Sequence, residues 1–356
     1  RLAVKIGLIG RADDRGIGIQ TWEFHRHMPV HSTLVVLTND RAFPEDPARF
    51  GRDVVHVDSN LSTKRDQRGL DERKVRRWLQ PLDVVFAVET VYDWRLIDWA
   101  HDAGVKVVIQ GNPEFYCHHQ YGFPQPDRWV WPTGWMLDEL GEHLPPEQLD
   151  VLPVPTVDRP STAADPEDDA LRVLHVVGRP AAGDRQGTLE FVDALASIRG
   201  RVHVTLTSQE GGLPSTQRLG RHVTCDVIST SQADRWELYR NQHILVSPRK
   251  YGGLHLPGLE AMASGLALVM PDCSPNGMWP GRRMKTRKGQ RVRTPFGGIQ
   301  MAAVHPFDIA RQIDIYARDR AALSADMAEA KRWADFNTWE AHAEYSYMPL
   351  FEEVLS

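Results

Sequence analysis

The segment 244–270 constrains the fold of this chain more than any other part of the sequence. It opens with the short apolar run 244–246, passes through a glycine-bearing loop into a helix expected to open at Pro257, and returns to an apolar run after Gly265. A strand, a loop, a helix and a second strand in this order predict a βαβ unit. Unpaired N–H groups and partial positive charge gather where such a helix begins, which suits a phosphate. One turn inside the helix, Glu260 could hold a sugar or ribose hydroxyl.

Short apolar runs alternate with helical patterns along the rest of the chain. In the first half the expected strands are 2–9, 34–37, 54–57, 84–88 and 105–109, and the expected helices are 16–28, 71–79 and 94–103. A second series starts with a strand at 171–177 and continues with a helix at 188–197, strands at 202–206 and 223–228, and a helix at 232–240. The acidic, proline-bearing segment 157–169 between the two series is typical of a linker. This layout predicts two doubly wound α/β domains with parallel sheets.

Length and composition agree with two domains that bury large cores, because the chain has 356 residues and is 42% hydrophobic. Its net charge of −5 argues against a protein that coats nucleic acid over its whole surface. No apolar run approaches the roughly 20 residues that cross a bilayer, and no signal-peptide pattern appears. The three cysteines are far apart and lack metal-ligand spacing, so we expect free thiols in a reducing cytoplasm and no zinc site.

The stretch around the glycine loop resembles the donor-site signature of retaining glycosyltransferases of the GT-B fold, in particular glycosyltransferase family 4. That motif runs acid-Gly-aromatic-Gly-Leu-Pro-x-x-Glu-Ala-Met-Ala-x-Gly. The matching positions are Gly253, Leu256, Pro257, Glu260, Ala261, Met262, Ala263 and Gly265. Two positions depart from it: Gly252 stands where the family has a glutamate that engages the donor sugar, and His255 replaces a glycine. The chain as a whole also resembles glycosyltransferases encoded by bacteriophages of high-GC hosts.

The resemblance implies two Rossmann-like domains that face an interdomain cleft. Residues 1–158 would form the acceptor-side domain and residues 171–337 the donor domain. The C-terminal helix, 338–356, would pack back on the first domain, although from the sequence alone it could equally cap its own.

The resemblance further implies transfer of a sugar from a nucleoside diphosphate sugar to a hydroxyl, with retention at the anomeric carbon and without a metal or other cofactor. The residues with an implied catalytic role are Arg179 and Arg185, which would clamp the diphosphate, and Glu260, which would hold the ribose. Gln186 stands at the family's usual lysine position, so the second cation is assigned to its neighbour Arg185. The expected donor-binding residues are Gly16, Gly18, Gly178, Lys250, Gly253, Leu254, His255, Leu256 and Pro257. A dinucleotide site at Gly16 and Gly18 is an alternative, but the third glycine of that fingerprint is missing.

Polar residues that follow two expected strands are candidates for the acceptor side. Glu89 follows the run 84–88, and Asn112 and Glu114 follow the run 105–109. Ligands of open parallel sheets bind beyond the carboxyl ends of the strands. His118 could orient donor or acceptor, as a histidine does in some relatives. Capping and loop hydrogen bonds are the alternative roles for these residues.

Three tryptophans and Thr133 lie in the segment 129–135, which resembles a short strand followed by a capped helix. Thr133 would cap that helix. The tryptophans could belong to the core or form a platform for a sugar.

The run from Arg282 to Arg293 has seven basic residues in twelve and no acid. We expect a loop there, which could attract an acidic acceptor such as a nucleic acid or could simply be solvated. The acceptor hydroxyl could therefore lie on a glycan, a protein, a small molecule or modified DNA. Instead of an active glycosyltransferase, the chain could be a sugar-nucleotide-binding protein with little transferase activity, because Gly252 replaces a carboxylate. The sequence gives no indication of the oligomeric state.

Overall fold

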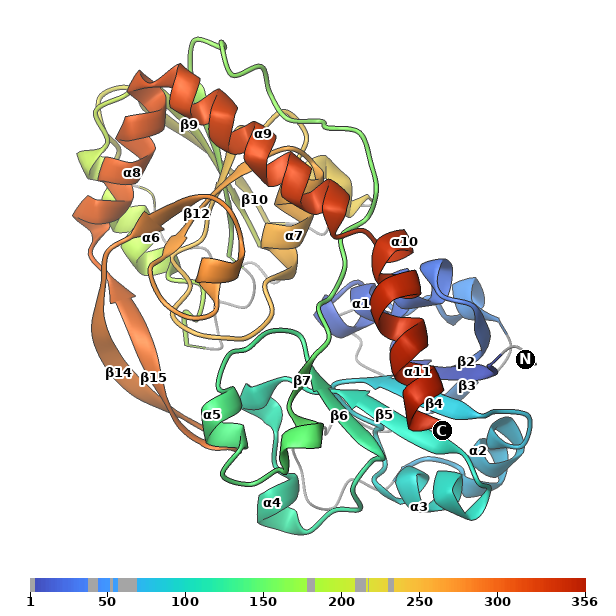
Figure 1. The fold of residues 1–356 in the computed structure, drawn as a ribbon. Coiled ribbons are helices and arrows are strands. Elements are labelled where there is room, and N and C mark those ends of the chain that lie inside the picture. The colour runs from blue at the N-terminus through green and yellow to red at the C-terminus, as the bar shows by residue number, and fades with distance from the viewer. Residues whose placement is uncertain are drawn as a thin grey trace. The chain divides into compact units, whose positions relative to one another are not determined.

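The computed structural model describes residues 4–37, 44–51, 54–56, 69–177, 183–208, 216, 218–229 and 234–356. The chain divides into two compact units (Figure 1). Unit 1 consists of Arg1–Pro155, Arg293–Gly297 and Trp339–Ser356, and unit 2 of Thr156–Val292 and Gly298–Thr338. Each unit is built around its own parallel sheet and its own hydrophobic core.

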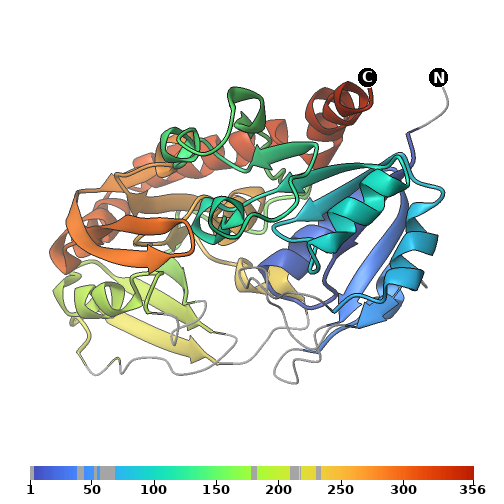
Figure 2. The ribbon, with the colours of Figure 1, turned by 90° about the horizontal axis from the view of Figure 1, so that it is seen from below.

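Unit 1 contains a seven-stranded sheet in the order β3-β2-β1-β4-β5-β6-β7. The strands are β1 (Ile6–Gly10), β2 (Val30–Leu37), β3 (Val54–His56), β4 (Val84–Val88), β5 (Lys106–Gln110), β6 (Arg128–Trp131) and β7 (Asp150–Val151). The sheet is parallel throughout. The chain order reverses between β1 and β4, so the connecting helices lie on both faces of the sheet (Figure 2). Both central strands are buried along their whole length, which is why they read as continuous apolar runs.

The longer helices of unit 1 agree with the helices expected from the sequence. They are α1 (Gly16–His27), α2 (Glu72–Leu79) and α3 (Arg95–Asp102). The carboxylate of Asp71 accepts a hydrogen bond from the N–H of Lys74 and caps α2. Short helical turns follow β5, namely a 3₁₀ turn at Pro113–Phe115 and α4 (His118–Tyr121), and α5 (Leu137–Leu140) follows β6.

The C-terminal segment belongs to unit 1. It consists of α10 (Trp339–His342), a π-helical turn (Ala343–Tyr347) and α11 (Met348–Val354). Aromatic side chains join it to α1 and β4: the ring of Phe24 lies 5.9 Å from that of Trp339, and the ring of Phe86 lies 5.8 Å from that of Phe351. An ion pair of 2.6 Å between Arg128 and Glu353 adds a polar contact at the surface.

Unit 2 contains a six-stranded parallel sheet in the order β10-β9-β8-β11-β12-β13. The strands are β8 (Leu171–Val176), β9 (Val202–Thr207), β10 (Val223–Ile228), β11 (Ile244–Val246), β12 (Ala267–Pro271) and β13 (Arg282–Met284). Its helices are α6 (Thr188–Ala194), α7 (Leu256–Ala263), α8 (Pro306–Arg318) and α9 (Arg320–Phe336). The chain order reverses between β8 and β11, as it does between β1 and β4 of unit 1. In the described ranges of the chain, no helix has both the length and the apolar character to cross a membrane.

The expectation of a loop from Arg282 to Arg293 is wrong. Its first residues form β13, which extends the sheet by pairing with β12, and its remainder lies in β14 (Thr286–Thr294). Strand β14 pairs with β15 (Gly297–Val304) as a separate two-stranded hairpin, which Figure 1 shows at the edge of the ribbon. Strands need alternating side-chain directions rather than apolar residues, so a charged strand is stable where its side chains reach water.

Two smaller expectations also need correction. The hydroxyl of Thr133 accepts a hydrogen bond from the N–H of Trp135 within a turn, and α5 begins only after Met136 without a side-chain cap from the residue before it. In the segment 232–240, the structure describes the residues from Asp234 onward, and these form a 3₁₀ helix (Arg235–Leu238) that Asp234 caps. The three tryptophans of the segment 129–135 are buried, as expected of core residues.

Candidate functional site

The loops that follow β8 and β11 meet at the point where the strand order of unit 2 reverses. Open parallel sheets bind ligands at such reversal points, beyond the carboxyl ends of the strands. One loop ends at Gly187, where α6 begins, and the other runs from Ser247 to His255, where α7 begins. A Cβ atom on Gly187 would lie 2.3 Å from the carbonyl oxygen of Pro248, and Gly187 has a φ of +68°. The two loops therefore touch, and only glycine fits at this contact.

Two guanidinium groups converge on Gly252 in this corner. A Cβ atom on Gly252 would lie 2.0 Å from Nη2 of Arg185 and 2.2 Å from Nη2 of Arg249, which puts these two nitrogens within about 4.2 Å of each other. Gly252 has a φ of +126°, so a side chain there would also be strained. Both arginines donate to the carbonyl oxygen of Tyr251, Arg185 through Nε at 3.1 Å and Arg249 through Nη2 at 3.3 Å. The corner thus concentrates positive charge on a patch of bare backbone.

Lys250 does not share this position, although it is adjacent to Arg249. Its ammonium group lies 3.0 Å from the carboxylate of Asp184 and 3.1 Å from that of Glu190. Burial alone would lower the pKa of Lys250, but the hydrogen bonds to the two carboxylates raise it. Asp184 also accepts a hydrogen bond of 2.7 Å from the N–H of Thr188 at the start of α6. Lys250 therefore braces the loop before α6.

The start of α7 is formed by the expected donor-binding residues of the glycine loop. Leu256 and Pro257 are its first two residues, and His255 precedes them. Nε2 of His255 is 3.0 Å from the hydroxyl of Ser247, and Gly258 leaves space for the ring over the first turn. Burial lowers the pKa of His255 well below its usual value, and the nearby arginines lower it further. The imidazole is therefore neutral and acts as a buried part of the corner.

Glu260 lies one turn inside α7, and two neighbouring side chains donate hydrogen bonds to its carboxylate. Arg235 donates to one carboxylate oxygen at 2.8 Å, and the hydroxyl of Tyr239 donates to the other at 2.6 Å. Burial raises the pKa of Tyr239 well above its usual value, and the carboxylate of Glu260 raises it further. Each carboxylate oxygen can accept more than one hydrogen bond, so Glu260 has the capacity to receive a ligand hydroxyl.

From the sequence, Arg249 and Lys250 could both face a phosphate or could form a solvated charge pair, and the structure separates the two. Sequence reasoning missed two residues of this corner, namely Arg235 and Tyr239. Arg235 and Tyr239 gave no signal, because only the fold brings them to Glu260. Gly178 and Arg179 lie outside the described residues.

The loop after β1 in unit 1 differs from the loops of unit 2. The carboxylate of Asp13 is fully buried and pairs with Arg11 and with Arg15, the latter at 3.2 Å. Gly16 opens α1 next to this group. A Cβ atom on Gly18 would lie 2.0 Å from the carbonyl oxygen of Asp13. The close contact with Asp13 therefore explains the glycine at position 18, and no bound ligand is needed to explain it.

Three of the four acceptor-side candidates surround one small cavity at the ends of β4 and β5. Glu89, Asn112 and His118 line it together with aromatic residues that include Trp94 and Trp129. The cavity measures ≈ 10 Å³, about the space of a single water. The amide of Asn112 donates to the carboxylate of Glu89 at 2.7 Å, and burial lowers the pKa of His118 to about 3.

The fourth acceptor-side candidate, Glu114, is buried nearby in the 3₁₀ turn after β5. It is not among the residues that line the cavity.

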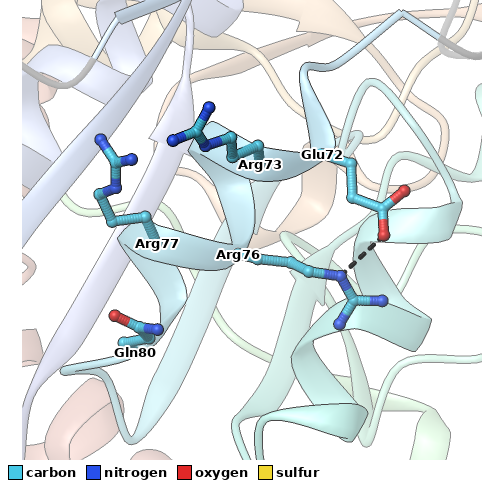
Figure 3. A pocket seen from close by; sticks show the side chains of 5 residues that line it. All are labelled: Glu72, Arg73, Arg76, Arg77 and Gln80. Atoms are coloured by element: carbon cyan, nitrogen blue, oxygen red, sulfur yellow. Dashed lines mark hydrogen bonds and ion pairs between the residues drawn. The ribbon is translucent and has the colours of Figure 1, made fainter.

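A larger hollow lies on the surface of α2 (Figure 3). Its lining side chains belong to this helix and to Gln80, the residue that follows it, and Arg76 reaches toward Glu72. No loop at a strand end contributes to it, so it lacks the converging groups of a binding site. Across the described stretches of sequence, no three His, Cys, Asp or Glu side chains are grouped as metal ligands.

Comparisons with known proteins agree with this geometry. Residues 172–282 match the family described as Glycosyl transferases group 1, which places the match on the unit that carries the arginine corner. No curated protein sequence matches the chain.

Several solved structures share the fold over almost the whole chain. Anabaena Alr3699/HepE in complex with UDP-glucose is 14% identical with a TM-score of 0.66, and 99% of each chain is covered. The lipopolysaccharide outer core galactosyltransferase WaaB is 16% identical with a TM-score of 0.60, covering 96% of this chain and 99% of WaaB. A glycosyltransferase from Rickettsia africae ESF-5 is 10% identical with a TM-score of 0.65, and both chains are covered completely. The chain therefore has the GT-B fold, with two Rossmann-like domains.

Proposed function

We propose that this protein is a glycosyltransferase that moves a sugar from a nucleoside diphosphate sugar to a hydroxyl acceptor, with retention at the anomeric carbon. The observation that carries the proposal is the convergence of Arg185 and Arg249 on Gly252. The match of residues 172–282 to glycosyltransferases and the UDP-glucose bound by one structural neighbour support it.

In this proposal the diphosphate occupies the corner between Arg185, Arg249 and the start of α7. Charge-assisted hydrogen bonds from guanidinium groups are strong and match the geometry of phosphate oxygens. They would stabilise the negative charge that develops on the leaving diphosphate, so that no metal is needed for this purpose. The resemblance adds Arg179 to the same group. Glu260 would accept a hydrogen bond from a ribose hydroxyl.

The proposed reaction breaks the bond between the anomeric carbon and the diphosphate oxygen. The acceptor oxygen attacks from the face that the diphosphate leaves, and its proton passes to a phosphate oxygen. This sequence retains the anomeric configuration and requires no separate protein base. For the acceptor side we propose Glu89, Asn112 and His118, because they lie together beyond the ends of β4 and β5, where parallel sheets bind ligands.

The proposal is tested first by binding and then by turnover. Thermal-shift screening against UDP-, GDP-, ADP- and dTDP-sugars should give one selective increase of the melting temperature. The selected donor, labelled in the sugar, should then yield product in the presence of EDTA, and NMR should show the anomeric configuration of the donor. Product of inverted configuration would disprove retention. Binding without product across a broad acceptor panel would favour a nucleotide-sugar-binding protein, and the absence of any shift would contradict the proposal altogether.

A further inference from the structure

The hairpin formed by β14 and β15 carries an unusual charge for this chain. From Arg282 to Val304 the sequence contains seven basic residues and no aspartate or glutamate, while the whole chain has a net charge of −5. Neither strand belongs to the sheet of unit 1 or of unit 2, since the two strands pair only with each other among the described elements. The charge is therefore gathered on one two-stranded ribbon, whose turn residue Phe296 packs on the hydrophobic cluster of unit 1.

Two of the seven basic residues are used within the fold. Arg282 donates to the side chain of Gln312 at 2.9 Å and stacks on the ring of Tyr316. Arg283 donates to the carbonyl oxygens of Asn276 and Trp279, and burial lowers its pKa. These two arginines anchor β13 and the turn before it.

The other five basic residues are exposed, and we call them the hairpin cations: Lys285, Arg287, Lys288, Arg291 and Arg293. Within the described residues none of them forms an ion pair with a carboxylate. The single side-chain hydrogen bond of the group runs from Arg291 to the carbonyl oxygen of Gly298 at 2.7 Å. Like charges side by side on a hairpin destabilise it, and a bound anion would remove this cost.

The arginines among the hairpin cations share one face of β14. Arg287, Arg291 and Arg293 occupy odd positions of β14, so they project from the same face of the strand. Positions two apart on a strand are about 6.6 Å apart, so these three arginines form a row about 20 Å long. Several cations on one face of a strand match a polymer that carries many negative charges along its length.

The apolar residues of the hairpin narrow the choice of polymer. Ile299 is 3% exposed, and no residue of β14 or β15 is among the large hydrophobic residues that lie exposed in the described chain. A membrane-binding hairpin would present such a residue to the lipid, and a binder of single strands would present an aromatic ring for base stacking. A two-stranded ribbon rich in arginine fits the major groove of a duplex and its phosphates.

We propose that the β14–β15 hairpin binds double-stranded nucleic acid through its phosphates. This inference is independent of the proposed sugar transfer, because binding requires only the hairpin cations. Nucleic acid would then bind to one surface of a protein whose overall charge is negative.

Fluorescence anisotropy with a labelled 20-base-pair DNA duplex tests the inference, using the full chain at 50 to 300 mM NaCl. Five phosphate contacts would give a slope of log K against log salt of about −4.5. The variant R287Q/R291Q/R293Q should reduce the slope by about 2.7 and the affinity at 100 mM salt at least 10-fold. The matched control is R73Q/K74Q/R77Q, which removes three exposed cations of α2, two of which line the hollow of Figure 3. This control should bind the duplex nearly as the unmodified protein does.

Two further measurements keep the inference open to refutation. The variant R287Q/K288Q removes two cations that make no hydrogen bond within the described residues, so it tests charge even if the triple variant loses stability. Polyglutamate and vesicles of anionic phospholipid are the competing probes. Equal loss of affinity in the α2 control, a salt slope near zero, or vesicle or polyglutamate binding as tight as duplex binding would each overturn the inference.

Discussion

Each unit brings a pair of arginines together beyond buried strands, from one loop in unit 1 and from two loops in unit 2, but the space between the arginines is filled differently. In unit 1 the carboxylate of Asp13 lies between Arg11 and Arg15. In unit 2 Gly252 lies between Arg185 and Arg249 and offers no side chain at all. The first group has a carboxylate between its guanidinium groups, whereas the second has bare backbone at the corresponding place.

This difference separates a structural role from a binding role for arginines in similar loops. An arginine pair that holds a buried carboxylate contributes to stability, and removal of that carboxylate leaves buried charge behind. An arginine pair that meets over glycine is arranged for an external anion, because the guanidinium groups can reach a ligand without displacing a side chain. The predictions below test this separation.

The largest effect is expected at Asp13. The substitution Asp13→Asn keeps the shape but removes the charge between two arginines, so it should lower the free energy of unfolding by about 3–5 kcal/mol. Urea unfolding measures this change. Asp14→Asn is the control, because Asp14 is adjacent but its side chain is 68% exposed. A loss below about 1 kcal/mol at Asp13 would show that the buried group is not the structural anchor described here.

The next effect is expected at Gly252. The substitution Gly252→Asp would give unit 2 the arrangement of unit 1, with a carboxylate between two arginines, and should weaken nucleoside diphosphate binding about 100-fold, or about 2.7 kcal/mol. Gly252→Ala is the matched control, because it introduces the same Cβ and the same backbone strain without a charge. Calorimetric titration of both variants separates the two causes. Equal affinities of the Asp and Ala variants would mean that charge at this position has no influence on binding.

A smaller effect is expected from the buried histidines of the described chain, of which His118 lies in unit 1 and His175, His243 and His255 lie in unit 2. Burial lowers the pKa of His118 to about 3 and that of His175 to about 4, and it lowers the pKa of His255 well below its usual value. Burial also lowers the pKa of His243. These residues are neutral in the folded protein but take up protons on unfolding below about pH 6.5. Stability should therefore be complete above pH 6.5 and decrease as the pH falls, by about 1.4 kcal/mol per pH unit for each histidine.

Urea unfolding between pH 7 and pH 5 measures this slope. His118→Phe fits the aromatic surroundings of that ring and should remove the contribution of one proton. An unchanged slope in this variant would show that His118 does not stay neutral in the folded state.

Much of the fold could be predicted from the sequence, because the strands of both sheets are buried on both faces. Val84–Val88 and Ala267–Pro271 are buried at every position, so each appears in the sequence as a continuous apolar run. The helix capped by Asp71 and the glycine loop before α7 follow from local chemistry in the same way. The hairpin could not be predicted, since β14 is stabilised by pairing with β15 and shows almost no apolar pattern.

The candidate site could be predicted in part. The glycine loop, Arg185 and Glu260 are visible in the sequence because they are close to expected strand ends. The choice between the neighbours Arg249 and Lys250 could not be made, because it depends on Asp184 and Glu190 more than 50 residues away. Contacts of this kind arise from the packing of separate loops, and the spacing of residues within one loop does not contain them.

The central claim is that Arg249, and not Lys250, binds the phosphates together with Arg185. Calorimetric titration of the nucleoside diphosphate selected by thermal shift, with Arg249→Gln and Lys250→Gln as paired variants, tests this claim most directly. We expect Arg249→Gln to weaken binding at least 30-fold, and Lys250→Gln to change it less than 3-fold while lowering the melting temperature. Weaker binding in Lys250→Gln than in Arg249→Gln would contradict the account.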